Sequence, residues 1–244
     1  MIEMPLDASD GRADTGHATN DTTESSVARA RATVYGLLSG VFDGDVETLS
    51  SALEDGTFTE LAAALPAEMP TDALARSDLD AETLKIGYDN LFVVPGPHYV
   101  PPFASGHADD PSESFESDSP YHEVGQAGEL LGDPAAAAAR AHAAVDFEPQ
   151  RGDGIPDHLA ADLEFMQLLC EHEARRLQAG ESDDELAAVR ELQRATISRL
   201  AWLDTFHERV AQHDTAEGVY AALARFARTF VAWDVDEGIG STNS

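Results

Sequence analysis

Apolar residues recur along most of the chain at the spacing of an amphipathic helix, and no segment alternates for long enough to predict a strand. The clearest helix follows Pro156, because Pro156 and Asp157 are typical of a first helical turn. One face of this segment, which runs to Gln178, collects the following apolar side chains: Leu159, Leu163, Met166, Cys170, Ala174 and Leu177. We expect this helix to lie at the centre of the fold.

The same spacing and helix-start signals predict helices on both sides of the central one. The expected helices cover residues 25–43, 45–53, 58–65, 81–92, 120–131, 134–145, 182–203 with a break near Trp202, and 214–231. Three Ser/Thr/Asp–Glu pairs predict capping boxes: Thr57 with Glu60, Ser182 with Glu185, and Asp214 with Glu217. The sequence therefore predicts an all-α fold, a single globular bundle of roughly eight to ten helices.

Composition divides the chain into one domain with two tails. Residues 1–24 contain no aromatic side chain and are rich in polar residues, so we expect a disordered acidic tail. The helical domain is expected at residues 25–234, with a second tail at 235–244. Between Val93 and Pro120 the six prolines and many polar residues break all periodicity. We expect residues 93–105 to be ordered and residues 106–119 to form a flexible acidic insertion.

The charge balance narrows the choice of partners. The chain carries 46 acidic and 15 basic residues, a net charge of −31, so nucleic acid and anionic lipid surfaces would repel it. Such a composition resembles that of cytoplasmic proteins from halophiles that keep molar salt inside the cell, where charge repulsion is screened. No apolar run is long enough to span a membrane, and no secretion signal is visible at the N-terminus. We expect a cytoplasmic protein without membrane insertion.

Motifs for catalysis and cofactor binding are absent from the sequence. The single cysteine, Cys170, excludes a thiolate zinc cluster, and the nine histidines do not have ligand spacing. There is no phosphate-binding loop, dinucleotide fingerprint, zinc-protease motif or nucleophile elbow. We therefore expect a binding protein that is not an enzyme and that carries no metal or cofactor.

Two polar residues on the central helix are the best candidates for a function. His158 and Asp162 lie one turn apart on a stripe that also carries apolar residues, and a bond between them would orient the imidazole. The alternative is that His158 and Asp162 are structural, as most half-buried polar residues are. Residue types alone do not decide between these interpretations.

Three segments together resemble a known family. They are Leu84-Lys85-Ile86-Gly87-Tyr88-Asp89-Asn90-Leu91-Phe92-Val93-Val94-Pro95-Gly96, then Pro101-Pro102-Phe103-Ala104-Ser105, and then Pro156-Asp157-His158-Leu159 running into Leu163-Glu164-Phe165-Met166. Their order and spacing resemble the TorD/DmsD/NarJ family of molybdoenzyme maturation chaperones over most of residues 25–233.

The resemblance implies a function and a set of partners. Members of this family are all-helical cytoplasmic proteins that bind the apo catalytic subunit of a DMSO-reductase-type molybdoenzyme and its twin-arginine leader peptide. They delay export until the molybdopterin cofactor has been inserted. The same role is implied here, with nitrate reductase and DMSO or TMAO reductase among the possible clients and with a monomer or homodimer as the chaperone.

The resemblance also implies a peptide-binding site. Asp157 and His158 match the family's Asp-His pair in the peptide-binding region, and Asp162 is a candidate orienting partner. The aromatic and proline-rich neighbourhood of that region matches Tyr88, Phe92, Pro101, Pro102 and Phe103. The alternative for Tyr88 and Phe92 is a place in the core.

Three features depart from the family pattern. Gly154 and Ile155 stand where many members have a glutamate, Ala104 stands where an acidic residue is common, and the acidic insertion after Ser105 is unusually long. The alternative function is an acidic helical scaffold or interaction module without a molybdoenzyme client.

Overall fold

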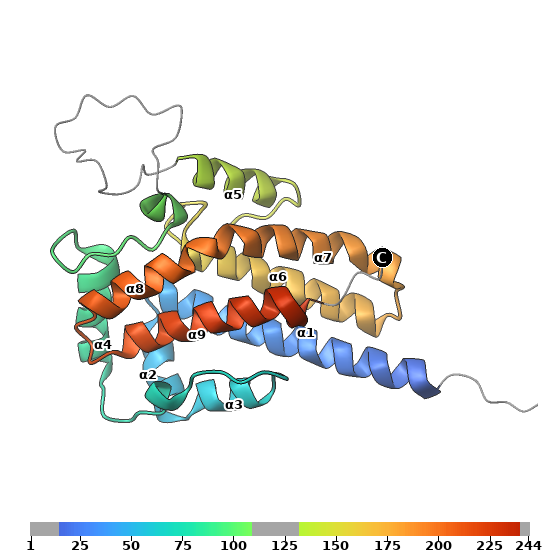
Figure 1. The fold of residues 1–244 in the computed structure, drawn as a ribbon, viewed down its shortest axis with the longest axis horizontal. Helices are drawn as coiled ribbons and strands as arrows, with labels where there is room; N and C mark the ends of the chain where they lie inside the picture. Colours follow the sequence, from blue (N-terminus) through green and yellow to red (C-terminus); the bar gives the residue numbers. More distant parts are fainter. Residues whose placement is uncertain (1–14, 109–131, 240–244) are drawn as a thin grey trace, which may run out of the picture.

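A computed structural model describes residues 15–108 and 132–239, and these residues form one helical bundle (Figure 1). Its α-helices are α1 (Thr15–Phe42), α2 (Val46–Glu54), α3 (Thr57–Ala63), α4 (Ala81–Tyr88), α5 (Asp133–Ala143), α6 (Leu159–Gln178), α7 (Asp183–Ser198), α8 (Leu203–His213) and α9 (Val219–Trp233). Short 3₁₀ or π turns are η1 (Asp72–Leu74), η2 (Asp89–Val93), η3 (Ala104–His107), η4 (Arg199–Trp202) and η5 (Asp234–Gly238). The prediction of an all-α fold is confirmed. The helix expected at 120–131 and most of the insertion expected at 106–119 lie outside the described residues.

Helices α1 and α6 form the centre of the bundle. They run antiparallel, because the Ser25 hydroxyl donates to the Ala174 carbonyl while the Ser39 hydroxyl donates to that of Ala160. The six apolar residues predicted to share one face of α6 are all buried, with at most 5% of their surface exposed. Burial of each large side chain among them contributes about 1.5 to 3 kcal/mol. The prediction of a central helix is therefore confirmed.

Several helix ends differ from the expected ones. Helix α1 already begins at Thr15, within the segment expected to be a tail, and Ile239 is 4% exposed beyond the expected end of the domain at 234. The start of α6 at Leu159, with His158 as the N-cap, replaces the expected start at Pro156. The reason is tertiary, because the residues before Leu159 pair with a distant loop described below.

The predicted capping boxes had different outcomes. Ser182 and Glu185 form the box that opens α7, and the break near Trp202 is present as η4. The box at Thr57 is wrong, because Gly56 in the left-handed conformation precedes the helix and Thr57 is its first residue. The box at Asp214 is also wrong: its carboxylate accepts from the backbone N–H of Ala216 and Ala221, and α9 begins after Gly218.

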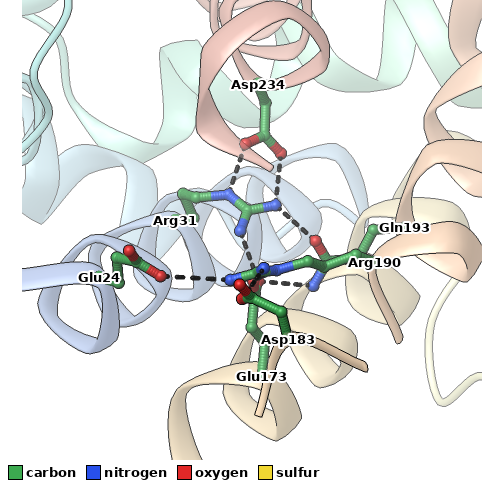
Figure 2. A network of polar contacts seen from close by, with 7 residues as sticks. All are labelled: Glu24, Arg31, Glu173, Asp183, Arg190, Gln193 and Asp234. Atoms are coloured by element: carbon green, nitrogen blue, oxygen red, sulfur yellow. Dashed lines mark hydrogen bonds and ion pairs between the residues drawn. The ribbon is translucent and has the colours of Figure 1, made fainter. Parts of the chain in front are cut away.

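A buried network of ion pairs joins α1, α6, α7 and the C-terminal turn (Figure 2). The Arg31 guanidinium, 1% exposed, donates to Asp234, to Glu173 at 2.8 Å and to the side-chain carbonyl of Gln193 at 2.8 Å. Arg190 donates to the other oxygen of Glu173 at 2.8 Å. Burial opposes the charge of Glu173, but Arg31 and Arg190 outweigh it and hold the pKa of Glu173 below its usual value. The network fixes η5 against α1 and α6.

Within residues 15–108 and 132–239, no helix is long and apolar enough to cross a membrane. In the same residues, no group of three or more His, Cys, Asp or Glu side chains is placed to hold a metal ion.

Candidate functional site

Two segments that are about fifty residues apart in the sequence meet at the start of α6. The Ala104 N–H donates to the Asp157 carbonyl at 3.0 Å, and the Leu159 N–H donates to the Pro102 carbonyl at 2.8 Å. These bonds flank an isolated antiparallel bridge between Phe103 and His158. Residues 101–105 and 157–159, which carry two of the three motif segments, therefore form one structural unit.

Asp157 connects this unit through its side chain. Its Oδ2 accepts from the Ser105 N–H at 2.7 Å and from the Ser105 hydroxyl at 2.5 Å. Its Oδ1 is buried and has no hydrogen-bond partner among the described residues, and only 1% of Asp157 is exposed. Asp157 is therefore half satisfied, with one oxygen able to accept another donor.

His158 is the N-cap of α6. Its Nδ1 accepts from the Ala160 N–H at 3.1 Å, which requires the neutral imidazole. Burial lowers the pKa of His158 to about 4, although Asp153 and Asp157 act in the opposite direction. Gly152 allows this packing, because its φ of +83° is left-handed and a Cβ there would lie 2.7 Å from the Cβ of His158.

Asp162 does not orient His158, contrary to our expectation. Its Oδ1 accepts instead from Nη2 of Arg199 at 2.6 Å, while the Nε2 of His142 lies 3.8 Å away. Burial raises the pKa of Asp162 to about 6; Arg199 lowers it and Asp157 raises it further. The expected bond was wrong because His158 Nδ1 turns back to cap its own helix.

Four buried polar atoms around Asp162 lack hydrogen-bond partners within the described part of the chain. They are Oδ1 of Asp157, Oδ2 of Asp162, Nε of Arg199 and Nε2 of His142. Each buried unsatisfied group costs about 1 to 3 kcal/mol, so such groups are rare and mark places where water, an ion or a ligand is bound. The two carboxylate oxygens of this cluster can accept hydrogen bonds from a guest, whereas Nε of Arg199 can only donate one.

A pocket of about 410 Å³ opens next to the cluster, between α5 and the segment that leads into α6. His142 and Phe147 form part of its wall, and Phe147 stacks on Phe165 at 4.9 Å between ring centroids. The remaining lining residues are Ala139, Ala143, Asp146, Glu148, Pro149, Gly154, Ile155 and Pro156. The pocket thus has apolar walls and two carboxylates, and it ends at the residue directly before Asp157.

The predicted aromatic residues lie deeper in the bundle. Tyr88 and Phe92 are 8% and 5% exposed, and the Tyr88 hydroxyl donates to the Phe42 carbonyl at 3.0 Å. Pro101 and Pro102 are buried, whereas Phe103 is half-buried. Phe92 stacks on Phe206, which also contacts Trp202 and His107. This aromatic chain links Tyr88 to the 101–105 segment, because His107 bonds to the Pro101 carbonyl at 2.8 Å.

Sequence reasoning missed His142, Arg199 and the role of Ser105. His142 comes from an alanine-rich helix and Arg199 from the break between α7 and α8, and neither has a periodic relation to Asp162. The one signal in the sequence that could have indicated Arg199 was the scarcity of basic residues. A chain with 15 basic residues has few that can neutralise a buried carboxylate such as Asp162.

A comparison with protein families gives one match: the family model described as Nitrate reductase delta subunit matches residues 49–208, well over half of the chain. The matched region includes the segments 101–105 and 157–159, the residues that line the pocket, and Arg199. No curated protein and no solved structure matches the chain.

Proposed function

Because the chain belongs to the nitrate reductase delta subunit family, whose members are non-catalytic chaperones of nitrate reductase assembly, we propose that it binds the twin-arginine leader of one molybdoenzyme catalytic subunit in the cytoplasm. Binding would hold the subunit back until its cofactor has been inserted. The proposal rests mainly on one observation: the family match covers the joined segments 101–105 and 157–159 and the pocket beside them.

The chemistry of the site suits such a leader. The apolar segment of the leader would lie against Phe147, Ile155 and Pro156, while Asp146 and Glu148 on the pocket wall favour a cation. The free oxygen of Asp157 would accept from an arginine, since charge-assisted hydrogen bonds to a guanidinium are strong and directional. We infer that apolar burial supplies most of the affinity, and that the carboxylates select for arginine.

Access to Asp157 requires a movement, because Asp157, His158 and Asp162 are each at most 7% exposed. Helix α5 borders the pocket and buries few large side chains, so it can move at a low cost. It lies on the outside of the bundle next to η3 (Figure 1), and the side chains that it buries are Ala135, Ala138 and His142. Alanines bury little apolar surface, so displacing α5 costs much less than displacing a helix held by leucine or phenylalanine.

The first experiment identifies the client. The chain is captured at high salt from cells induced for anaerobic respiration, and the co-purifying proteins are identified by mass spectrometry. We expect a molybdenum-pterin oxidoreductase catalytic subunit. Its repeated absence would favour the acidic scaffold.

The second experiment tests the leader. A two-arginine peptide, with adjacent arginines followed by an apolar segment, is titrated into the protein at molar salt and compared with a two-glutamine peptide of otherwise identical sequence. We expect saturable binding of the first peptide and weaker binding of the second. Equal affinity for both would contradict the carboxylate part of the proposal.

A further inference from the structure

Arg31 and Arg199 are bound in very different ways. Arg31 has a complete site, in which Nε, Nη1 and Nη2 all donate to side-chain oxygens of Asp234, Glu173 and Gln193 (Figure 2). Among residues 15–108 and 132–239, Arg199 donates one hydrogen bond, from Nη2 to Asp162. Its Nε is buried without a partner in the described part of the chain, and so is the second oxygen of Asp162. The two groups thus touch without forming the paired bonds that an arginine and a carboxylate can make.

Around Arg199 and Asp162 there are more hydrogen-bond acceptors than Arg199 donates to. Oδ1 of Asp157 is free, and the charge of Asp157 is close enough to Asp162 to raise the pKa of Asp162. Nε2 of His142 is unpartnered as well, in a side chain that lines the pocket. Asp157, Asp162 and His142 are each at least 97% buried, so these are not surface groups satisfied by bulk water.

The side chain of Arg199 lies where it can move away from Asp162. Arg199 begins the 3₁₀ turn η4 at the break between α7 and α8, and 17% of its side chain is exposed. By contrast, 1% of the Arg31 side chain is exposed. A side chain at such a break can turn toward solvent without unwinding a helix.

We infer that Asp157 and Asp162 together form a receptor for one guanidinium group of the bound peptide, and that Arg199 occupies part of this receptor in the free protein as a placeholder. The inference rests on the proposed function. Arg199 keeps Asp162 from being a buried unpaired charge, which is strongly unfavourable in a protein interior. A guest arginine that enters beside Pro156 would take over Asp162, bond to the free oxygen of Asp157 and release Arg199 to solvent. Arg199 and the guest arginine thus compete for the carboxylate of Asp162. The protein therefore binds a peptide that contains an arginine more tightly than one that does not.

The test compares two variants that change the net charge equally. Arg199→Gln removes the placeholder, whereas Arg228→Gln removes an exposed arginine that pairs with the exposed Asp204. For the two-arginine peptide, we expect Arg199→Gln to bind about tenfold more tightly than the wild type, because the guest no longer has to displace a charged hydrogen bond. Arg228→Gln should bind like the wild type. The gain should vanish with the two-glutamine peptide.

A second variant keeps the inference testable if Arg199→Gln does not fold. Asp162→Asn leaves no buried unpaired carboxylate, and Arg199 can turn to solvent. We expect this variant to lose most of the preference for arginine over glutamine in the peptide. Binding by Arg199→Gln that equals or falls below that of Arg228→Gln, or full preference in Asp162→Asn, would overturn the inference. If the wild type binds neither peptide, the proposed function fails as well. If the wild type binds the two-arginine peptide selectively and Arg199→Gln and Asp162→Asn bind both peptides as Arg228→Gln does, the inference alone fails.

Discussion

Ser105 donates both its backbone N–H and its hydroxyl to the same carboxylate oxygen of Asp157, at 2.7 and 2.5 Å. This pair holds the proline-rich loop to the start of the central helix, and it does so with one oxygen of Asp157 left over. Asp157 thus holds the two segments of the site together through one oxygen and can accept a hydrogen bond from a guest through the other.

The first prediction concerns this pair. Ser105→Ala removes the hydroxyl bond but keeps the backbone bond, and we expect the free energy of unfolding to fall by about 1.5 to 3 kcal/mol. Chemical denaturation measures the change. The control is Ser198→Ala, whose hydroxyl bonds to the Ala195 carbonyl in an exposed position and whose loss should be nearly neutral. Equal effects of the two substitutions would show that the Ser105 hydroxyl does not hold the loop.

The second prediction concerns the buried network. Arg31→Met leaves Glu173 and Asp234 buried without their main partner, and we expect a loss of about 3 to 5 kcal/mol in the free energy of unfolding. Arg76→Met is the control, because Arg76 pairs with Asp78 and Glu217, whose side chains are 64% and 65% exposed. Exposed pairs contribute about 1 kcal/mol or less. A tolerated Arg31→Met would mean that the network does not fix the C-terminal turn.

The third prediction concerns pH. Burial lowers the pKa values of His107, His142 and His158 to about 4, whereas a histidine in the unfolded chain titrates near 6.5. The unfolded chain therefore binds more protons between these values, so the stabilisation is fully present above about pH 6.5 and is lost as the pH falls toward 4. Asp162, whose pKa is raised to about 6, acts in the opposite direction but is a single group. We expect a net loss of stability below about pH 6.5.

A substitution at His158 isolates one of these histidines. Asparagine can also accept from the Ala160 N–H as an N-cap, but it does not titrate in this range. His158→Asn should therefore reduce the loss in the free energy of unfolding between neutral pH and pH 4 by on the order of 3 kcal/mol. His172→Asn, at an exposed position on α6, is the matched control for replacing a histidine by asparagine. Identical profiles for His158→Asn and the wild type would refute the assignment.

The fourth prediction concerns salt. A net charge of −31 repels itself in dilute buffer, and the screening length falls to about 3 Å at 1 M salt. We expect the unfolding temperature to rise steeply from low to molar sodium chloride. Sucrose at equal osmolality stabilises by exclusion without screening, and it should raise the unfolding temperature less. An unfolding temperature independent of salt would contradict the expectation of adaptation to a salty cell interior.

The sequence predicted the parts of the fold that depend on local pattern. Periodic apolar residues located α6 and its buried face, and the Ser182–Glu185 box located the start of α7, because both signals act within a few residues. Thr57 shows the limit of such signals, since the left-handed Gly56 starts that helix instead.

The site was less accessible to prediction, because it depends on contacts between distant segments. His158 was identified from its place on the predicted helix, and Asp157 and Phe103 were identified by resemblance. The pairing of the two segments arises from bonds across about fifty residues, which no periodicity encodes. The expected bond from His158 to Asp162 was wrong for a local and a distant reason. The Nδ1 of His158 caps its own helix, and Arg199, 37 residues beyond Asp162 in the chain, bonds to the carboxylate.

The central claim is that the pocket between α5 and residues 146–156 receives the leader, and blocking the pocket tests it most directly. Ala139 and Ala136 are both exposed on α5, but Ala139 lines the pocket and Ala136 is not among its lining residues. Titration of the two-arginine peptide at molar salt should show Ala136→Trp binding like the wild type and Ala139→Trp binding at least about tenfold more weakly, because the indole fills the pocket. Equal binding by the two tryptophan variants would contradict the account.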